Sequence, residues 1–381
     1  MRLFFFTVLL TSFLISYSGK AQNITSDKPQ SISNPEYGIW QDKETPISFE
    51  LVQTFGGENS PIEALLSTTR FIQTLIIDKS SNIYLQDSRN NRLISYNKNG
   101  QLRWSVNKEG RGPGDISTSY DFTWNQKDKL YLLNIRSTRL DEFDLDGNYL
   151  TSYSLSGLNE YGATTVEYLS PDTFLLSSPI KETYGAHIQI INIASDSLLE
   201  SEFQLKSFPE IKIPRGFYQT TPVKVLNDRI VLGSDHSYGF YIYNLEGKRV
   251  KKVTREIDAN VSPAVVINPP PGSNSFTILG ESYPPIKLNQ EFYIQQNKWP
   301  TNIEDPNKFL QSALDRKKVD PPEFKYSIDL LNNNYKLLYS YEYTDNDNIG
   351  IIRAIDHEGY LYTVTDSPYP QIHKYKVTLN E

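Results

Sequence analysis

The sequence predicts an all-β fold, a six-bladed β-propeller, from three observations. Runs rich in Val, Ile, Tyr and Phe are separated by short segments of Asn, Asp and Gly, which is typical of strands joined by tight turns. One unit of this kind recurs in register 47 residues further along the chain. Further units of similar size fill the chain to its end, and a period of about 40–50 residues built from short strands is typical of propeller blades.

The repeat is clearest in the first two units, which begin at Asp78 and near Gln126. Six pairs of identical or similar residues keep the same offset, and chance would hardly produce so many in register. These pairs are Tyr84 and Tyr131, Arg89 and Arg136, Arg92 and Arg139, Leu93 and Leu140, Tyr96 and Phe143, and Gly100 and Gly147. We therefore expect the two units to share one structure.

Each unit is expected to form four antiparallel strands joined by hairpin turns such as Asn99-Gly100. In the first unit we expect strands at Phe71–Asp78, Asn82–Gln86, Arg92–Asn97 and Gln101–Val106. The later units are Thr164–Leu205, Thr221–Val253, a fifth with inner strands within Phe276–Gln296 and outer strands within Lys325–Tyr343, and a sixth at Ile351–Leu379.

The sixth unit has residues for only three strands, so the ring needs a fourth strand from elsewhere. The segment Ile47–Phe55, before the first unit, has Ile47, Phe49 and Leu51 on one face and can supply it. We expect these three side chains to be buried against the neighbouring blade. Such closure removes the open edges of a sheet, which otherwise favour aggregation. We count six blades, with seven as the alternative. A pair of β-sandwiches is the rival fold, but sandwiches do not repeat at a fixed period.

The chain is predicted to have a signal peptide at residues 1–21, a polar linker at 22–45 and a propeller domain at 46–381. The apolar run that follows Arg2 is too short for a membrane span and ends at small residues suited to export peptidases. Within the propeller, a short helix-bearing insertion is expected at about 297–323. It starts at Asp305-Pro306 and has an apolar stripe of Phe309, Leu310 and Leu314.

Charge and composition exclude several classes of function. The net charge is −7, and it becomes −9 without the basic residues Arg2 and Lys20, so nothing attracts a nucleic acid. The absence of cysteine rules out disulfides, a lipid-anchored form, cysteine catalysis and thiolate metal sites. No histidine spacing indicates a metal site, and no motif identifies a catalytic residue or a cofactor. We therefore expect a soluble periplasmic or secreted protein, as a monomer without a membrane span.

The stretch from Asn82 to Leu102, followed by Gly110-Arg111-Gly112-Pro113-Gly114-Asp115, resembles the six-bladed, NHL-like propellers exported by many Bacteroidetes bacteria. That family commonly has a G-x-G-P-G-acidic-aromatic loop after its first blade, and Ile116 replaces the aromatic residue here. The resemblance is specific over Phe71–Tyr153 and the last blade, and looser between Tyr161 and Tyr335. It implies the fold and an exported location, but no settled activity.

Strand order places the connections between second and third strands, and the crossings between blades, on one face of the ring. This face has nearly all of the long segments, including Phe208–Thr221 and Ile257–Asn274. Because function concentrates on loops held by a rigid scaffold, we expect a ligand site there. The candidate binding residues are Arg89, Arg111, Asp115, Arg136, Tyr184, Arg215, Phe217, Tyr218 and His236.

Two of these candidates also have structural interpretations. The set Asp87, Asn90 and Arg92 partly recurs in the next unit, which favours a brace of the turn beside Arg89. The glycines of Gly110–Gly114 form either an anion-binding nest or a tight crossing between blades. The leading functional hypothesis is a binding or scaffolding module for a protein or a glycan. The alternative is an enzyme at the mouth of the central channel, such as a metal-dependent lactonase or a lyase.

Overall fold

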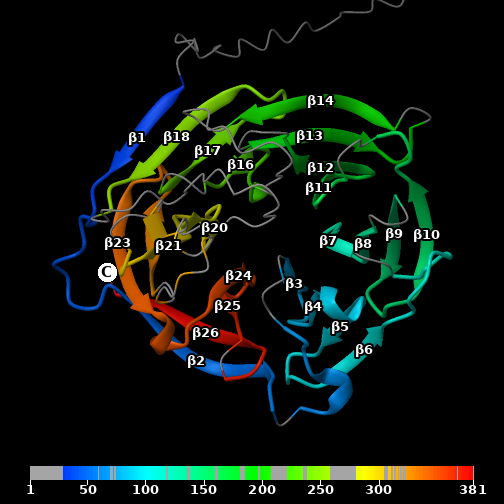
Figure 1. The fold of residues 1–381 in the computed structure, drawn as a ribbon, viewed down its shortest axis with the longest axis horizontal. Helices are drawn as coiled ribbons and strands as arrows, with labels where there is room; N and C mark the ends of the chain where they lie inside the picture. The colour runs from blue at the N-terminus through cyan, green and yellow to red at the C-terminus, as the bar shows by residue number, and fades with distance from the viewer. Residues whose placement is uncertain are drawn as a thin grey trace, which may run out of the picture.

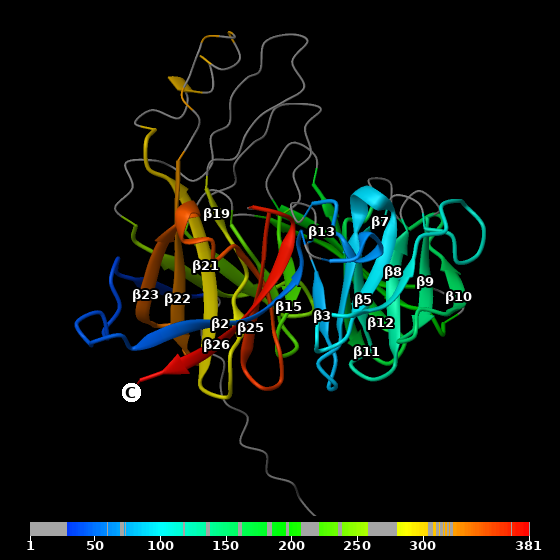
Figure 2. The same ribbon diagram turned by 90° about the horizontal axis from the view of Figure 1, so that it is seen from below.

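The computed structural model shows six β-sheets in a ring, with their innermost strands around one central axis (Figure 1), which confirms the predicted six-bladed propeller. The region that these innermost strands enclose is called the channel. It describes residues 29–380 except 59, 69–71, 73, 117–118, 135–137, 159–161, 181–184, 196–197, 207–220, 235–237, 258–279, 304–307, 310–311, 313–314, 316, 318–319, 321–322 and 367. Seen from the side, the strands run between the two faces of the ring (Figure 2).

The first three blades have four antiparallel strands each, ordered from the channel outward. Their inner strands contain short hydrophobic runs, because a neighbouring blade covers each of the two faces of a blade. Blade 1 contains β3 (Leu75–Ile77), β4 (Ile83–Asp87), β5 (Arg92–Tyr96) and β6 (Leu102–Val106). Blade 2 contains β7 (Ser119–Trp124), β8 (Lys129–Asn134), β9 (Arg139–Asp144) and β10 (Tyr149–Ser154). Blade 3 contains β11 (Thr165–Ser170), β12 (Thr173–Pro179), β13 (Gly185–Asn192) and β14 (Leu199–Lys206).

The last three blades keep the same order but differ at their edges. Blade 4 contains β15 (Val223–Val225), β16 (Ile230–Leu232), β17 (Gly239–Tyr243), β18 (Arg249–Arg255) and, outermost, β1 (Gln30–Asn34). Blade 5 has a broken inner strand, β19 (Glu281–Ser282) and β20 (Ile286–Lys287), followed by β21 (Phe292–Pro300), β22 (Phe324–Asn332) and β23 (Leu337–Thr344). Blade 6 contains β24 (Ile351–Ile355), β25 (Tyr360–Thr365), β26 (Gln371–Leu379) and β2 (Ile47–Gly56).

Strand β2 closes the ring, as the sequence predicts. It is antiparallel to β26, and its ladder extends from Ile47 opposite Leu379 to Gly56 opposite Gln371. The prediction that Leu51 is buried is wrong, because half of its surface is exposed. The ladder is regular from Ile47 to Leu51, and its irregularity follows between Leu51 and Gln53, where it turns the later side chains to the other face of the blade. The two buried hydrophobic side chains of the strand are therefore in different joints: Ile47 packs between blades 5 and 6, and Phe55 packs between blades 6 and 1.

The N-terminal segment predicted to be a polar linker forms part of the ring instead, from Gln30 onward. Strand β1 pairs in parallel with β18, and Ile32 is buried in the joint between blades 4 and 5. The side chain of Asn34 then bonds to the backbone of Tyr335 and Leu337. The sequence did not predict this strand, because only two of its residues, Ile32 and Asn34, are buried and only one of them is hydrophobic.

The chain continues from β1 across the outer strand of blade 5 before it enters β2. The Trp40 amide donates to the Leu338 carbonyl at 2.7 Å, and the Gln41 side chain bonds to both backbone groups of Ser340. A Cβ atom on Gly38 would lie 2.2 Å from the Leu338 oxygen, so this close approach requires glycine. Residues 30–56 therefore form an N-terminal belt around blades 4, 5 and 6.

The prediction of a helix-bearing insertion at about 297–323 is also wrong in part. Asn297–Pro300 are the end of the long strand β21, with Trp299 buried against Tyr238. In the described part of the insertion only Lys308, Phe309 and Ser312 have helical geometry, so no helix of ordinary length is seen there. Leu310 and Leu314 lie outside the described residues. None of the helices in the described part of the chain is long and apolar enough to span a membrane.

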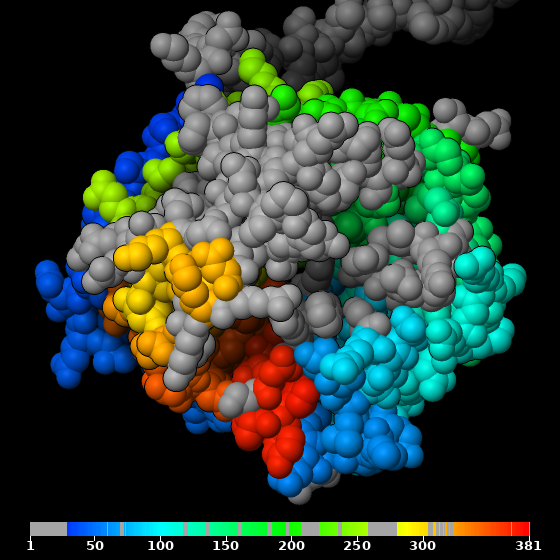
Figure 3. Space-filling view, viewed as in Figure 1, coloured from blue at the N-terminus to red at the C-terminus, as the bar shows by residue number. Residues whose placement is uncertain are grey.

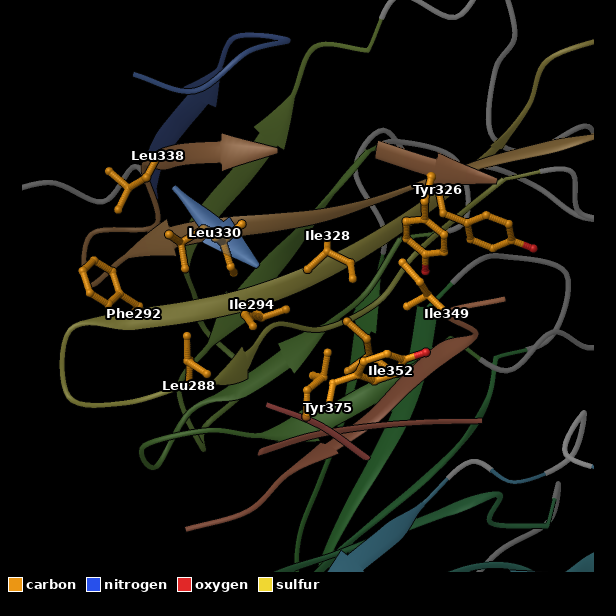
Figure 4. Packing of buried hydrophobic residues seen from close by; sticks show 13 residues of the cluster. Leu288, Phe292, Ile294, Tyr326, Ile328, Leu330, Leu338, Ile349, Ile352 and Tyr375 are labelled. Atoms are coloured by element: carbon orange, nitrogen blue, oxygen red, sulfur yellow. The ribbon is translucent and has the colours of Figure 1, made fainter. Parts of the chain in front are cut away.

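The hydrophobic core consists of clusters in the joints between neighbouring blades. Figure 4 shows the joint of blades 5 and 6, where Ile294 and Ile328 of blade 5 approach Ile352 and Tyr375 of blade 6. A second cluster joins blade 6 to blade 1 around Phe55, Tyr96 and Tyr362. On the face seen in Figure 3 the red surface of blade 6 lies beside the blue surface of blade 1.

We predict that two hydrophobic residues of the closing strand β2 contribute very differently to the free energy of unfolding. Phe55 is 1% exposed and packs in the joint of blades 1 and 6, so we expect Phe55→Ala to cost about 3–5 kcal/mol of the free energy of unfolding. Leu51 is 50% exposed, and Leu51→Ala should change it by less than about 0.5 kcal/mol. Urea unfolding of both variants provides the measurement, and equal losses would contradict the assigned register.

A second prediction concerns the N-terminal belt. A chain that begins at residue 45 should be less stable than one that begins at residue 29, because it lacks β1 and the contacts of Trp40 and Gln41. Loss of buried Ile32 alone removes about 1.5–3 kcal/mol of hydrophobic stabilisation. Thermal melting of the two chains measures the difference. Identical melting temperatures would show that the belt adds nothing to the ring.

Candidate functional site

The two faces of the ring differ in the length of their connections. On one face, here called the turn face, strands are joined by hairpins such as 78–82 and 97–101, closed by backbone hydrogen bonds. On the other, called the loop face, β18 is joined to β19 through residues 256–280 and β21 to β22 through 301–323. The predicted asymmetry of the two faces therefore holds, and the inner strands of all blades begin at the loop face.

The structure describes only three of the nine candidate binding residues. Arg89 lies on the short helix η2 (Ser88–Asn90) and is exposed. Arg111 and Asp115 lie in the crossing between blades 1 and 2, with Arg111 exposed and Asp115 half-buried. The other six lie outside the described residues: Arg136, Tyr184, Arg215, Phe217, Tyr218 and His236.

The turn beside Arg89 is braced by buried ionic groups. The Asp87 carboxylate accepts hydrogen bonds from the Arg92 Nε and the Asn90 amide, both at 3.0 Å, and from the Ser67 hydroxyl. The Arg92 guanidinium also donates to the carbonyl oxygens of Glu63 and Leu65, in the segment that leads into blade 1. These contacts support the structural interpretation of this set.

The glycine-rich crossing holds its own carboxylate. The Gly112 amide donates to Asp115 Oδ2 at 2.8 Å, and Lys108 Nζ lies 2.6 Å from Asp115 Oδ1. Lys108 and then the Gly112 amide lower the pKa of Asp115. A Cβ atom on Gly110 would lie 2.2 Å from the same carboxylate, so this position needs glycine. The crossing is thus an anion nest filled by the chain itself, which favours a structural role over external anion binding.

Arg139 of blade 2 binds the backbone of the same crossing. Arg139 Nε bonds to the Asp141 carboxylate at 2.6 Å, and its other nitrogens donate to the carbonyl oxygens of Arg111, Gly112 and Asp115 at 2.7–2.8 Å. Because Arg139 uses only the backbone of Arg111, the exposed Arg111 side chain is left for solvent or a partner. Asp115 is fully engaged within the crossing.

A separate group of polar residues lies at the central channel, and the sequence analysis missed it. It consists of one residue from each blade: Thr74, Asp121, Glu167, Lys224, Tyr283 and Arg353. We call this group the channel cluster. Four of its members, on β7, β11, β15 and β24, are charged residues within otherwise apolar or neutral inner strands, and that pattern is the sequence signal that could have found them.

Lys224 connects three blades of the channel cluster. Its Nζ lies 2.7 Å from Glu167 Oε1 of blade 3 and donates to Thr74 Oγ1 of blade 1 at 3.3 Å. Burial opposes the charge of Lys224, but the carboxylates of Glu167 and Asp121 outweigh it and raise the pKa of Lys224. Lys224 is therefore a fixed cation that reaches from blade 4 to the opposite side of the ring.

Asp121 is the most strongly perturbed acid of the cluster. It is 2% exposed, and burial raises its pKa to about 6, with a smaller contribution from Glu167. Lys224, the Thr74 hydroxyl and the Val166 amide act in the opposite direction. That amide donates to Asp121 Oδ2 at 3.1 Å from the inner strand of blade 3. Asp121 thus changes its protonation state close to neutral pH.

Arg353 and Tyr283 form the remaining side of the cluster. The Arg353 guanidinium carbon lies 5.6 Å from the centroid of the Tyr283 ring, and the Tyr283 hydroxyl donates to the Glu281 carboxylate. Burial, reinforced by Glu281, raises the pKa of Tyr283 well above its usual range, so its hydroxyl stays protonated. The charge of Arg353 also acts on Lys224, which places both cations in one electrostatic unit.

Blade 3 contains a Ser, a His and a Glu in a row, which superficially suggests nucleophilic catalysis. His187 Nδ1 lies 3.4 Å from the Ser178 hydroxyl, and His187 Nε2 lies 2.6 Å from the Glu202 carboxylate. Ser178 is only 3% exposed, so a substrate carbonyl cannot reach its oxygen without a rearrangement of the blade. We interpret the row as cross-strand pairing on adjacent strands β12, β13 and β14.

Metal-ligating groups are not gathered at any one point of the described chain. Within residues 29–380, masked positions excepted, no group of three or more His, Asp or Glu side chains is placed to hold an ion. In the channel cluster, the two carboxylates nearest the axis already face the Lys224 ammonium. These residues therefore suit hydrogen bonding to a polar ligand better than coordination of a cation.

Comparison with protein families supports the fold over the first part of the ring. A family model described as DUF5128, 6-bladed beta-propeller, matches residues 68–171, which span blades 1 and 2 and the start of blade 3. This chain is a six-bladed β-propeller similar to DUF5128. The resemblance inferred from Asn82–Leu102 and the glycine-rich crossing falls within the matched residues and is confirmed.

Solved structures extend the likeness around the whole ring. A protein from Bacteroides fragilis described as exported is 13% identical, with a TM-score of 0.55 over 92% of this chain and 100% of that chain. A member of the DUF4221 family from Bacteroides vulgatus is 9% identical, with a TM-score of 0.56 over 89% and 100% of the two chains. At such low identity the likeness shows the fold alone. A comparison with curated proteins found no match.

The raised pKa of Asp121 predicts a pH-dependent effect of the substitution Asp121→Asn. Because the folded-state pKa of about 6 lies above the ordinary 3.8, folding favours the protonated form. Wild-type stability should therefore fall as the pH rises from about 4 to about 6, and asparagine removes this loss. At about 1.4 kcal/mol per pKa unit, the variant should gain roughly 2–3 kcal/mol over wild type across this window.

Urea unfolding of both proteins at several values between pH 4 and pH 7.5 measures this gain. Asp228→Asn is the matched control, because Asp228 is exposed in a turn of blade 4 and its side chain has no part in the cluster. Its stability curve should run parallel to that of wild type. Parallel curves for Asp121→Asn as well would show that Asp121 is not perturbed by burial.

Proposed function

We propose that this protein is an exported binding module that holds a glycan or a protein segment at the loop-face end of its channel. The channel cluster is the observation that carries the proposal. Six blades contribute hydrogen-bond donors and acceptors, among them Glu167, Lys224 and Arg353, to one small volume at the axis. A few polar groups that converge on one point are typical of ligand sites.

The location rests on two supports. The apolar segment after Arg2 has the features of an export signal. The similar propeller from Bacteroides fragilis is described as exported. A periplasmic or secreted location would expose the loop face to glycans and proteins outside the cytoplasm, as a binding module requires.

An enzyme at the mouth of the channel is the second candidate, and Asp121 is the observation in its favour. A carboxyl group with a pKa of about 6 can accept and return a proton near neutral pH. Lys224 and the protonated Tyr283 lie in the same cluster and could stabilise negative charge or donate a proton. This supports proton abstraction of the lyase type more than a metal-dependent lactonase, since the nearby carboxylates face Lys224.

The substitution Glu167→Gln tests the binding proposal. It keeps the size of the side chain but removes the charge that pairs with Lys224, so a ligand held in the channel should lose at least tenfold in affinity. Ligands are first found on panels of immobilised glycans and peptides, and dissociation constants are then measured by calorimetry. Thermal melting confirms that the variant is folded at the temperature of the titration.

Glu246→Gln is the matched control, because Glu246 is exposed in the hairpin between β17 and β18 on the turn face. Its affinity should equal that of wild type. If Glu167→Gln and the control bind equally well, the ligand does not occupy the channel and the proposal fails. If Asp121→Asn binds a compound as tightly as wild type but no longer converts it, the protein is an enzyme and the second candidate function is correct.

A further inference from the structure

Arg353 is the one charged member of the channel cluster without a polar partner among the described residues. Glu167 faces Lys224 at 2.7 Å, Asp121 accepts from the Val166 amide, and Glu281 accepts from the Tyr283 hydroxyl. Arg353, in contrast, forms no hydrogen bond or ion pair in the described structure, and its Nε is enclosed without an acceptor. The residue as a whole is only partly buried, so its other guanidinium nitrogens can meet a ligand that enters the channel. Charged donors in a cluster of this kind usually have an acceptor, and a ligand would supply it.

The stacking of Arg353 on Tyr283 presents its donors for binding. A guanidinium that lies over a ring uses its face for the cation–π contact, while its N–H groups radiate from its edge. The edge is the part that binds a carboxylate through two parallel hydrogen bonds. The ring also limits the rotamers of the side chain, so less conformational freedom is lost when a ligand binds.

The surroundings restrict the ligand to one that carries an isolated negative charge. Asp121, Glu167 and Glu281 lie in or beside the cluster, and the whole chain has a net charge of −7. A polyanion or an acidic peptide would be repelled by these groups. A molecule that is mostly neutral and rich in hydroxyl groups would instead donate hydrogen bonds to the same carboxylates.

We propose that Arg353 binds the carboxylate of an acidic monosaccharide unit, such as a uronic acid, whose hydroxyl groups donate to the carboxylates of the channel cluster. This inference rests on the proposed binding function and narrows its ligand class from glycans and proteins to acidic sugars. Lys224, already paired with Glu167, adds a positive potential at longer range. Tyr283 acts as the platform that orients Arg353.

Titration calorimetry with D-glucuronate, D-galacturonate and N-acetylneuraminate tests the proposal, with glucose, galactose and acetate as neutral or sugar-free counterparts. We expect wild type to bind at least one sugar acid and to bind its neutral counterpart at least tenfold more weakly. Arg353→Gln should lose at least tenfold in affinity for that acid. Arg353→Lys, which keeps the charge without the paired donors, should fall between the two.

Arg229→Gln is the matched control, because Arg229 is exposed on the turn face, away from the channel cluster, and its side chain donates to the carbonyl of its neighbour Asp228. It should bind like wild type. Equal binding of a sugar acid by wild type and both Arg353 variants would overturn the assignment, and so would the absence of binding to every acid of the panel. Binding of a neutral glycan that is lost in Glu167→Gln but kept in Arg353→Gln would leave the proposed function intact and refute this inference.

Two further measurements guard against trivial results. Thermal melting of Arg353→Gln and Arg353→Lys identifies a variant that has unfolded, and the lysine variant then carries the comparison. A dipeptide with a free carboxylate distinguishes the sugar from the bare acid group. If the dipeptide and acetate bind as tightly as the sugar acids, Arg353 binds carboxylates without selecting a sugar, and the assigned ligand class is wrong.

Discussion

Closure of the ring is the constraint on which the rest of this structure depends. Each blade buries its faces against its neighbours, so an open ring would expose two complete blade faces at the seam between blades 6 and 1. Strand β2 prevents this by pairing with β26, and Phe55 packs at the seam with Tyr96 and Tyr362. The belt from Gln30 onward extends the same N-terminal segment over blades 4 and 5. A short polar segment thus holds half of the ring in place.

Buried arginines hold the backbone of the loop face against the blades. Arg92 and Arg139 each bond an aspartate within their own blade and donate to backbone carbonyls of the preceding crossing. Arg255 does the same between blades, since it bonds the Asp329 carboxylate at 2.8–3.0 Å and the Glu36 carbonyl in the belt. Removal of either partner would leave an uncompensated buried charge. These arginine contacts hold the irregular backbone of the crossings in place.

The channel cluster exists only because the ring closes. Thr74 and Arg353 belong to blades 1 and 6, on opposite sides of the seam, and Lys224 reaches toward them from blade 4. The same convergence creates the electrostatics of the site. Burial between the inner strands raises the pKa of Asp121, and the carboxylate of Glu167, which is distant in the chain, adds a smaller contribution. The position of these inner strands therefore determines both the packing at the axis and the electrostatics of the channel cluster.

The fold could be predicted from the sequence because its determinants are local. Alternating strands, Asn-Gly turns and the 47-residue offset between Tyr84 and Tyr131 each act within one blade, and the repetition reveals the architecture. The prediction of β2 succeeded for the same reason, since Ile47 begins a clear alternating run. The brace around Asp87 and Arg92 could also be recognised, because its parts lie within a few residues of one another.

What the sequence could not determine depends on contacts between distant segments. Strand β1 bonds through its backbone to β18, so its composition reads as a linker. Leu51 shares one face of β2 with Ile47 and Phe49 and is nevertheless exposed, because the cover of that face ends before Leu51, which no residue pattern indicates. The channel cluster takes one residue from each blade, and a single charged residue within an inner strand is too weak a signal until closure places it at the axis. Only the tertiary structure decided which of the many polar residues meet there, because electrostatic pairing acts through space and not along the chain.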